Sequence, residues 1–385
     1  MHWKTVLKAD AVVSAAALAI TALACCQKEE APVSDASYLQ TLDQSGIWVN
    51  SASASVPEYQ VYHHVHAFLD ECTIENGSAV SPDGKTRKVL FLGFDGMRAD
   101  AALQLFEGAN VFDQSLGGGR QSASGIRTLA AEGGIYLAYC GGETGTDTEQ
   151  TTSTSASWTS QFTGVWGASH GIKTNDDVKN LQYKTFILEY AEQGLHTALA
   201  FDWDQYLDVN LKEEVKLALS NPQLPVLFCD IDRETKDKLK KTEAETLELY
   251  NFVAPESPSP DAPFDSGMRD WVLARMAAGD DVVCGIFHNI DTAGHNYEFS
   301  PQNAQYKNAV YTCDTYAYEI LQVVAERESL YNEEWLVVFA NDHGGIGQGH
   351  GGQTLEERTT WIATNRLLDE AYFAEDYDGF TAQER

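Results

Sequence analysis

The sequence predicts an α/β fold, a three-layer α/β/α sandwich with a mostly parallel central sheet. Short apolar runs typical of strands alternate along the chain with segments of helical spacing. Three of these runs, 88–94, 281–287 and 336–340, are apolar apart from a charged first residue in the first two, which is the pattern of strands buried on both faces. Each is followed closely by an acidic residue. Because ligands bind at the carboxyl ends of parallel strands, these three ends predict one shared site.

The composition is that of a globular protein. Its 385 residues can form one large α/β domain or two smaller ones, and 43% of them are hydrophobic. The formal net charge is −31, from 57 acidic and 26 basic residues. An acidic chain offers no basic stripe to neutralise phosphates, so we expect no nucleic-acid polymer as a partner.

The first residues resemble a secretion signal. Lys4 and Lys8 give a positive start, and the apolar core 12–23 is too short to span a membrane comfortably. The core ends in a sequence that resembles a bacterial lipobox, with Cys26 as the lipidated residue. We therefore expect a lipoprotein signal segment at 1–26.

A lipid anchor on Cys26 would be the chain's only membrane contact. The following acidic segment, 27–30, resembles the export tag on surface lipoproteins of some Gram-negative bacteria. These features predict a lipid-anchored protein of the bacterial cell envelope, in the periplasm or on the cell surface. The alternative is a secreted protein cut after Ala24.

Residues 27–86 are polar and mixed, and we expect an N-terminal extension there that ends in a turn at 81–85. Its segment 59–69 fits an amphipathic helix or a strand. That segment carries His63, His64 and His66. We interpret them as part of a packing element rather than a metal site, because no acidic or sulfur ligand lies nearby.

Five cysteines follow the signal segment, and none has zinc-finger spacing. An odd number cannot pair completely, although one disulfide is possible in an oxidising compartment. Cys229 and Cys284 lie in apolar runs and are expected to be buried. The five are Cys72, Cys140, Cys229, Cys284 and Cys313.

The rest of the chain, 87–385, is expected to be the catalytic domain. Its predicted strands are 88–94, 135–139, 197–201, 224–229, 281–287 and 336–340. Its predicted helices are 101–106, 126–132, one starting at Trp158, 185–193, 244–253, 268–278 and 303–328. Residues 165–172 are expected to form a turn.

The stretch 335–352 contains the densest group of candidate ligands. Asp342 and His343 follow its strand directly, and His350 follows a glycine-rich loop. Glycine allows the tight backbone turns that would direct all three side chains to one point. Alone, the stretch could equally be a glycine-rich surface loop that carries two histidines.

The two other strand ends add Asp95 and the pair Asp291 and His295. Oxygen and imidazole ligands without thiolates suit zinc or manganese in a catalytic site. The six residues are too many for one tetrahedral ion, whereas two ions roughly 4 Å apart would use them all. The hydroxyl residues before Trp158 could supply a nucleophile, although any one of them could simply cap a helix.

Five segments, in order, resemble the alkaline phosphatase superfamily, most closely its type I phosphodiesterase/nucleotide pyrophosphatase branch. The resemblance covers about residues 86–365. The segments are FDGMRAD (94–100), TGVWGASHGI (163–172), DTAGH (291–295), NDHG (341–344) and GHG (349–351).

The resemblance implies a nucleophile at a fixed distance before Thr163, which is Thr154. Thr152, Ser153 and Ser155 are the alternatives if the helix begins elsewhere. It further implies two divalent metal ions, most plausibly zinc, with manganese as the alternative. One ion would be held by Asp95, Thr154, Asp342 and His343. The other would be held by Asp291, His295 and His350.

The activity so implied is hydrolysis of a small phosphoester through a phosphothreonine intermediate. The branch is expected to have an asparagine three positions after the nucleophile that donates to the phosphoryl group. Ser157 stands there and becomes the candidate substrate-binding residue. The chain also ends soon after Trp361, without the long tail of many relatives.

Three rival functions remain. A sulfatase would need a cysteine or serine convertible to formylglycine and an arginine four positions later, where Thr154 and Trp158 stand. A phosphomonoesterase would need an arginine for the dianionic monoester, for which Arg98 and Arg120 are possible. From a different class, the chain could be a metal-binding surface lipoprotein without catalysis.

Overall fold

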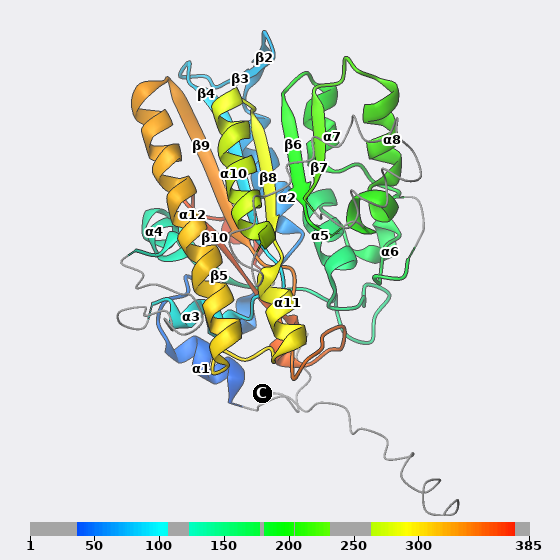
Figure 1. Ribbon diagram of the computed structural model, residues 1–385, viewed down its shortest axis with the longest axis vertical. Helices are drawn as coiled ribbons and strands as arrows, with labels where there is room; N and C mark the ends of the chain where they lie inside the picture. Colours follow the sequence, from blue (N-terminus) through cyan, green and yellow to red (C-terminus); the bar gives the residue numbers. More distant parts are fainter. Residues whose placement is uncertain (1–36, 107–122, 178–180, 204, 232–262, 374–385) are drawn as a thin grey trace, which may run out of the picture. The chain divides into compact units, whose positions relative to one another are not determined.

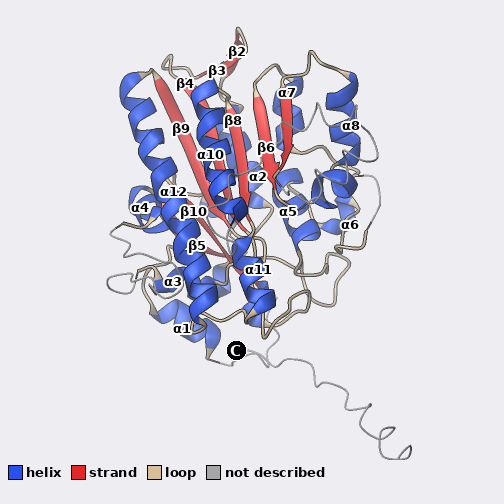
Figure 2. Ribbon diagram, viewed as in Figure 1, coloured by secondary structure: helices blue, strands red, loops and turns tan. Residues whose placement is uncertain are grey.

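The structure is a computed structural model that describes residues 37–106, 123–177, 181–203, 205–231 and 263–373. They belong to one compact unit, Ser34–Arg385, with an α/β architecture and a large, mostly parallel sheet (Figures 1 and 2). The strands are β1 (Val56–Pro57), β2 (Thr73–Glu75), β3 (Ser78–Val80), β4 (Thr86–Phe94), β5 (Gly134–Tyr139), β6 (Thr197–Phe201), β7 (Val226–Asp230), β8 (Val282–Phe287), β9 (Glu333–Ala340) and β10 (Thr359–Thr364).

The main path of the sheet runs β1-β5-β10-β9-β4-β8-β6-β7. Strands β9, β4, β8, β6 and β7 are mutually parallel, and β10 runs antiparallel to both of its neighbours. Because β4 lies between β8 and β9, the three strand ends predicted to carry ligands are neighbours. The predicted α/β fold is confirmed.

Helices cover both faces of the sheet. One face packs against α10, α12, α4 and α3, and the other against α2, α5, α7 and α8. The helices are α1 (Tyr38–Gln44), α2 (Gln60–Leu69), α3 (Ala99–Gln104), α4 (Gly125–Glu132), α5 (Thr154–Thr163), α6 (Gly167–His170), α7 (Phe186–Glu192), α8 (Lys212–Ser220), α10 (Pro263–Ala278), α11 (Asn289–Asn296), α12 (Ala304–Leu330) and α13 (Leu355–Arg358). Shorter turns of helix are η1 (Ala52–Ala54), η3 (Tyr206–Asn210) and η5 (Glu370–Tyr372).

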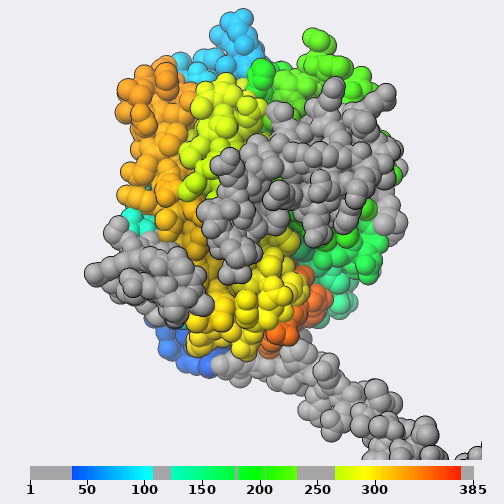
Figure 3. All heavy atoms as spheres, viewed as in Figure 1, coloured from blue at the N-terminus to red at the C-terminus, as the bar shows by residue number. Residues whose placement is uncertain are grey.

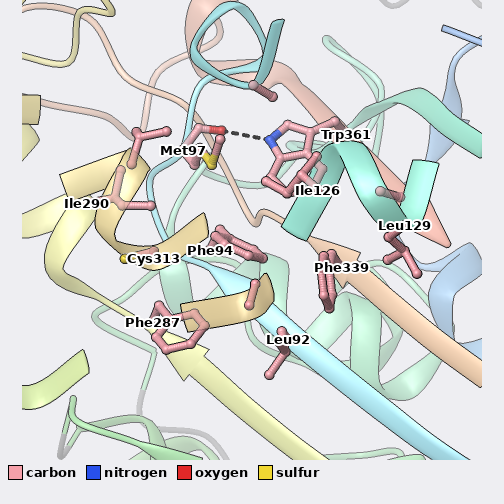
Figure 4. Packing of buried hydrophobic residues seen from close by; sticks show 14 of the residues in the cluster. Leu92, Phe94, Met97, Ile126, Leu129, Phe287, Ile290, Cys313, Phe339 and Trp361 are labelled. Carbon is pink, nitrogen blue, oxygen red and sulfur yellow. Dashed lines mark hydrogen bonds between the residues drawn. The ribbon is translucent and has the colours of Figure 1, made fainter. Parts of the chain in front are cut away.

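The central strand β4 fills both layers of the core. Leu92 and Phe94 point toward α12 and α4, whereas Val89 and Phe91 point toward α2 and α5. Figure 4 shows the first layer close to the carboxyl end of β4, where the rings of Phe94, Phe287, Phe339 and Trp361 gather. This aromatic packing fixes the strand ends relative to one another.

The expected N-terminal extension packs into the same unit. Its β1 pairs in parallel with β5, and its β3 pairs antiparallel with β4. Segment 59–69 forms helix α2, and His66 lies between Asp70 and Glu189, 3.1 and 3.2 Å away. The boundary at residue 86 therefore marks a change in the sequence pattern, but the residues on both sides of it pack into the same unit.

Most predicted elements of the catalytic region are present, and the differences are local. Helix α5 begins at Thr154, four residues before the predicted start. The expected turn at 165–172 contains the short helix α6. The helix predicted at 244–253 lies outside the described residues.

None of the five cysteines forms a disulfide, and Cys229 and Cys284 are fully buried as predicted. The signal segment lies outside the described residues. Within the described ranges, we find no helix with the length and apolar character needed to cross a membrane.

Candidate metal centre and nucleophile

The predicted ligands lie together at the carboxyl edge of the sheet, where β9, β4 and β8 end side by side (Figure 1). Asp95 follows β4 directly, Asp291 lies in the first turn of α11 after β8, and Asp342 follows β9. Ligand atoms within 4.8 Å of one another form three groups. They are Asp95, Asp342 and His343; Asp291, His343 and His350; and Asp95, His288 and Asp291.

In Asp95 and Asp342, one carboxylate oxygen accepts hydrogen bonds from the described residues and the other does not. Asp95 Oδ2 accepts a hydrogen bond from Trp158 Nε1 at 3.0 Å. Asp342 Oδ1 accepts from the backbone N–H groups of Gly96 and His343 at 3.0 and 2.9 Å. The other oxygens, Asp95 Oδ1 and Asp342 Oδ2, are buried without a hydrogen-bond partner among the described residues. Each carboxylate is therefore anchored through one oxygen and can offer the other to a cation.

Asp291 lies among histidines. His295 Nε2 and His288 Nε2 approach its Oδ2 at 3.3 and 3.5 Å, and His350 Nε2 lies 3.6 Å from its Oδ1. Burial would raise the pKa of Asp291, but hydrogen bonds from His288 and His295 outweigh that effect and hold the pKa well below its usual value. Asp291 is thus a carboxylate anion in this site.

The three predicted histidine ligands share one tautomer pattern. Their Nδ1 atoms contact backbone carbonyl oxygens, at 2.7 Å for His343, 2.9 Å for His295 and 3.0 Å for His350. Since a carbonyl only accepts, Nδ1 carries a proton in each ring, and Nε2, on the side of the carboxylates, is the atom that can bind a metal ion once the ring is neutral. This is the arrangement that a histidine ligand of a metal ion needs.

The electrostatics of the site favour a cation. Burial raises the pKa of Asp95 well above its usual value, and the carboxylates of Asp342 and Asp291 raise it further. Burial likewise raises the pKa of Asp342, partly offset by the N–H of Gly96. A divalent ion among these groups would remove the repulsion, so the residues present fit a metal centre.

The predicted histidine ligands differ in their exposure to solvent. Burial lowers the pKa of His350 to about 4, with His343 adding to the effect, and burial also lowers the pKa of His343. His295 has a side chain that is 44% exposed, and its hydrogen bond to Asp291 raises its pKa to about 9. The centre is therefore closed on the side of Asp342 and open on the side of α11. Figure 3 shows α11 (yellow) beside an orange-red part of the chain on the surface. Gln348, in the loop after β9, contacts His295.

Thr154 is the first residue of α5, and its Oγ1 lies 3.4 Å from His343 Nε2. The alternative hydroxyls have other partners. Thr152 Oγ1 donates to Gly352 O, Ser155 Oγ donates to Asn210 Oδ1, and Ser153 Oγ contacts Thr151 Oγ1. Thr154 is thus the hydroxyl of this cluster that faces the predicted ligands.

The first two glycines of the glycine-rich loop, Gly344 and Gly345, have no room for a side chain. A Cβ on Gly344 would lie 1.9 Å from Glu356 O, and one on Gly345 would lie 2.4 Å from the ring of Phe299. Arg98 supports this turn through hydrogen bonds to Phe299 O and Gly345 O, and it pairs with Asp100 at 2.7 Å. Arg98 is therefore a structural residue rather than a substrate ligand. Arg120 lies outside the described residues.

Ser157 lies on α5 three residues after Thr154 and is fully buried. Its Oγ has no well-formed hydrogen bond among the described residues, and the buried Glu58 and Cys140 lie beside it. No contact in the structure tests the assignment of Ser157 to substrate binding, which stays a prediction.

A different residue, Asn175, lies at the amino end of α5. Its Oδ1 accepts a hydrogen bond from Ser155 N at 2.9 Å. Among the described residues, no acceptor contacts its Nδ2, so this amide keeps a donor close to Thr154. Sequence reasoning missed Asn175, although it closely follows the quoted TGVWGASHGI segment.

The fold and the cluster together define an α/β protein with a candidate metal centre at the carboxyl edge of its sheet. The model of the type I phosphodiesterase / nucleotide pyrophosphatase family matches residues 89–378, and the chain belongs to that family. No curated protein matches the chain.

Solved structures with a similar fold include three hydrolases. Phosphonoacetate hydrolase from Sinorhizobium meliloti 1021 is 17% identical over 71% of this chain and 59% of its own, with a TM-score of 0.42. Alkaline phosphatase from the Antarctic bacterium TAB5 is 12% identical over 76% and 97%, with a TM-score of 0.44. Phosphonate monoester hydrolase of Agrobacterium radiobacter is 12% identical over 73% and 70%, with a TM-score of 0.43.

Proposed function

We propose that this protein is a metal-dependent hydrolase of small phosphoesters, of the phosphodiesterase/nucleotide pyrophosphatase type, with Thr154 as nucleophile. The observation that carries the proposal is the position of Thr154 Oγ1, 3.4 Å from His343 Nε2 at the amino end of α5. The same nitrogen lies 3.2 Å from Asp342 Oδ2 and 3.6 Å from Asp95 Oδ1. A binding protein has no need of a hydroxyl in that place.

Two divalent ions fit the residues present. Asp95, Asp342, His343 and Thr154 would hold one ion, and Asp291, His295 and His350 the other. When bound, such ions lower the pKa of the nucleophile and offset charge on the phosphoryl oxygens. Zinc is our first choice because of the mixed imidazole and carboxylate ligands, and manganese is the alternative.

The chain's own groups account for the course of the reaction. Thr154 Oγ1 gives up its proton to water and attacks phosphorus, while the bond from phosphorus to the leaving oxygen breaks and that oxygen, which keeps the bonding electrons, takes a proton from water. The phosphothreonine is then hydrolysed by water, which returns the threonine hydroxyl. The amino end of α5 favours the anionic group, and Asn175 Nδ2 donates to a phosphoryl oxygen.

Within the described residues, which do not include Arg120, the arrangement favours diesters over monoesters. A phosphate monoester carries two negative charges, which an arginine would best hold. Arg98 is engaged by Asp100 and by two backbone carbonyls. The leaving group would lie on the exposed side of His295, where the centre opens to solvent.

The test compares hydrolysis of an aryl phosphodiester, an aryl phosphate and an aryl sulfate by purified protein with zinc or manganese. We expect the diester to be fastest, and Thr154→Ala to lose activity by about 10³-fold or more while retaining metal. A sulfate-specific enzyme would contradict the proposal, and so would full diester turnover by Thr154→Ala. Metal binding without turnover of any of these esters would favour the metal-binding lipoprotein.

We further propose that the chain is a lipoprotein anchored through Cys26 in the bacterial cell envelope. The lipobox-like sequence supports this assignment, and the odd Cys25 is the departure from it. Labelled fatty acid should enter the wild-type chain expressed in a Gram-negative host, but not Cys26→Ser. The control Cys72→Ser should still be labelled. A soluble, unlabelled wild-type chain cut after Ala24 would show that the protein is secreted instead.

A further inference from the structure

His288 is a fourth histidine at the carboxyl edge, and the predicted ligand sets do not use it. It follows β8 and caps α11, and its backbone N–H donates to Asp265 Oδ1 at 3.1 Å. Its ring meets that of Phe201 edge to face, with centroids 5.5 Å apart. The ring is thus fixed on two sides, by its own backbone and by the end of β6.

Both ring nitrogens of His288 face carboxylates. Nδ1 lies 3.0 Å from Oδ1 of Asp202, the residue after β6, in an ion-pair contact rather than an aligned hydrogen bond, and Nε2 lies 3.5 Å from Asp291 Oδ2. The predicted ligand histidines instead direct Nδ1 to a backbone carbonyl and leave Nε2 to a metal. A ring between two carboxylates is suited to donate from both nitrogens.

Asp291 is the one ligand carboxylate for which the predicted site contains no residue that fixes its orientation. Asp95 is anchored by Trp158, and Asp342 by two backbone N–H groups. For Asp291, the neighbours of Oδ2 are His295 and His288, while Oδ1 is buried without a hydrogen-bond partner in the described part of the chain. Once His295 Nε2 binds a metal ion, it cannot donate a hydrogen bond to Asp291. His288 is then the residue that remains to hold Asp291 Oδ2.

We propose that His288, itself held by Asp202, is a positioning residue that fixes Asp291 so that Oδ1 faces the ion of Asp291, His295 and His350. The inference rests on the proposed two-metal function and deepens it. Asp202 and His288 add a polar layer behind the ligands, and β6 thereby becomes part of the support for the metal centre. Partners of this kind orient a ligand and raise its affinity for the ion.

The direct test measures zinc retained per chain after dialysis against zinc buffers of graded free concentration. Loss of such a partner weakens metal binding by about 10–100-fold. We expect His288→Leu to show this loss for one of two ions, with the other unchanged. His288→Gln, which keeps an N–H donor, should retain more zinc than His288→Leu, and Asp202→Asn should fall between wild type and His288→Leu.

Kinetics give a second measurement that a general loss of structure would not reproduce. Because the ligands themselves are intact, excess zinc should restore most of the kcat of His288→Leu, with KM changed little. The matched control is His196→Gln, an exposed histidine just before the amino end of β6, which should behave as wild type. Thermal unfolding in chelator should be similar for all variants.

Two results would overturn the inference. Unchanged zinc affinity in His288→Leu would show that Asp291 needs no such partner. Three ions per wild-type chain, falling to two in His288→Leu, would make His288 a ligand of a further ion with Asp95 and Asp291. Both results are measured as metal content. They therefore decide the role of His288 even if the chain hydrolyses no phosphoester and the proposed activity fails.

Discussion

The indole N–H of Trp158 donates to Asp95 Oδ2 at 3.0 Å, which joins helix α5 to the end of strand β4. The ring lies so close to the strand that a Cβ on Gly93 would be 2.7 Å from it. One tryptophan therefore orients a predicted ligand and fixes the helix that begins with Thr154. The glycine in β4 provides the space for it.

Trp158→Phe should keep most of the packing and lose the hydrogen bond. We expect metal binding at the Asp95 site to weaken by about 10–100-fold, because the carboxylate loses its anchor. The zinc bound per chain, measured over a series of free zinc concentrations, tests this expectation. The matched control is Trp361→Phe, which removes a core indole hydrogen bond to Met97 O instead (Figure 4). Equal metal loss in both variants would point to general core damage.

Asp342→Asn should have opposite effects on stability with and without metal. In chelator, it removes a buried charge near Asp95 and Asp291, so the midpoint of thermal unfolding should rise by about 2–4 °C for each kcal/mol of relieved repulsion. With zinc, the variant should be less stable than wild type because a ligand is lost. Asp281→Asn breaks the buried pair with Lys88 and should lower the midpoint in both conditions. An Asp342→Asn variant destabilised in chelator would contradict the repulsion argument.

Zinc loading should release a proton from His295. In the metal-free protein its hydrogen bond to Asp291 raises its pKa to about 9. Below that pH, zinc competes with a proton, so apparent affinity falls by up to about tenfold per pH unit as pH falls, and this dependence is lost above the pKa. Calorimetry at pH 7 in buffers of different ionisation enthalpy counts the protons. His295→Asn should release about one fewer than wild type, and an equal count would show that His295 is not displaced by the ion.

Asn175→Ala should lower kcat/KM for an aryl phosphodiester by about 10²-fold, because a donor to the phosphoryl oxygen is lost. Ser157→Ala should change the rate by less than about threefold, since its hydroxyl is buried beside Glu58. Steady-state kinetics on both variants decide between the two residues. The reverse ranking would support the assignment of substrate binding to Ser157.

The sequence was sufficient to predict strands β4 to β9 and the strand ends that carry ligands, but not β10 or the short strands β1, β2 and β3. Continuous apolar runs are a strong signal for buried parallel strands, and β4, β8 and β9 all have one. Asp95, Asp291 and Asp342 follow those runs closely, so their meeting at one edge required only the rule for parallel sheets.

Features that depend on packing could not be predicted in the same way. The start of α5 was placed too late because serine and threonine are weak helix formers, whereas in the structure every residue of α5 is buried and held by neighbours. Strand β1 has only two residues, too few for a periodic pattern. Asn175 lies 20 residues after its partner Ser155, and His288 pairs with Asp202, which follows a different strand, β6.

The position of β4 between β8 and β9 has a consequence for biogenesis. Strand β4 is synthesised early, but both of its parallel neighbours come from far later in the chain. Such long-range pairing folds slowly because large loops must close first. A nascent chain therefore has no place to hold an ion until its last strands have emerged, and metal acquisition becomes a late step of maturation.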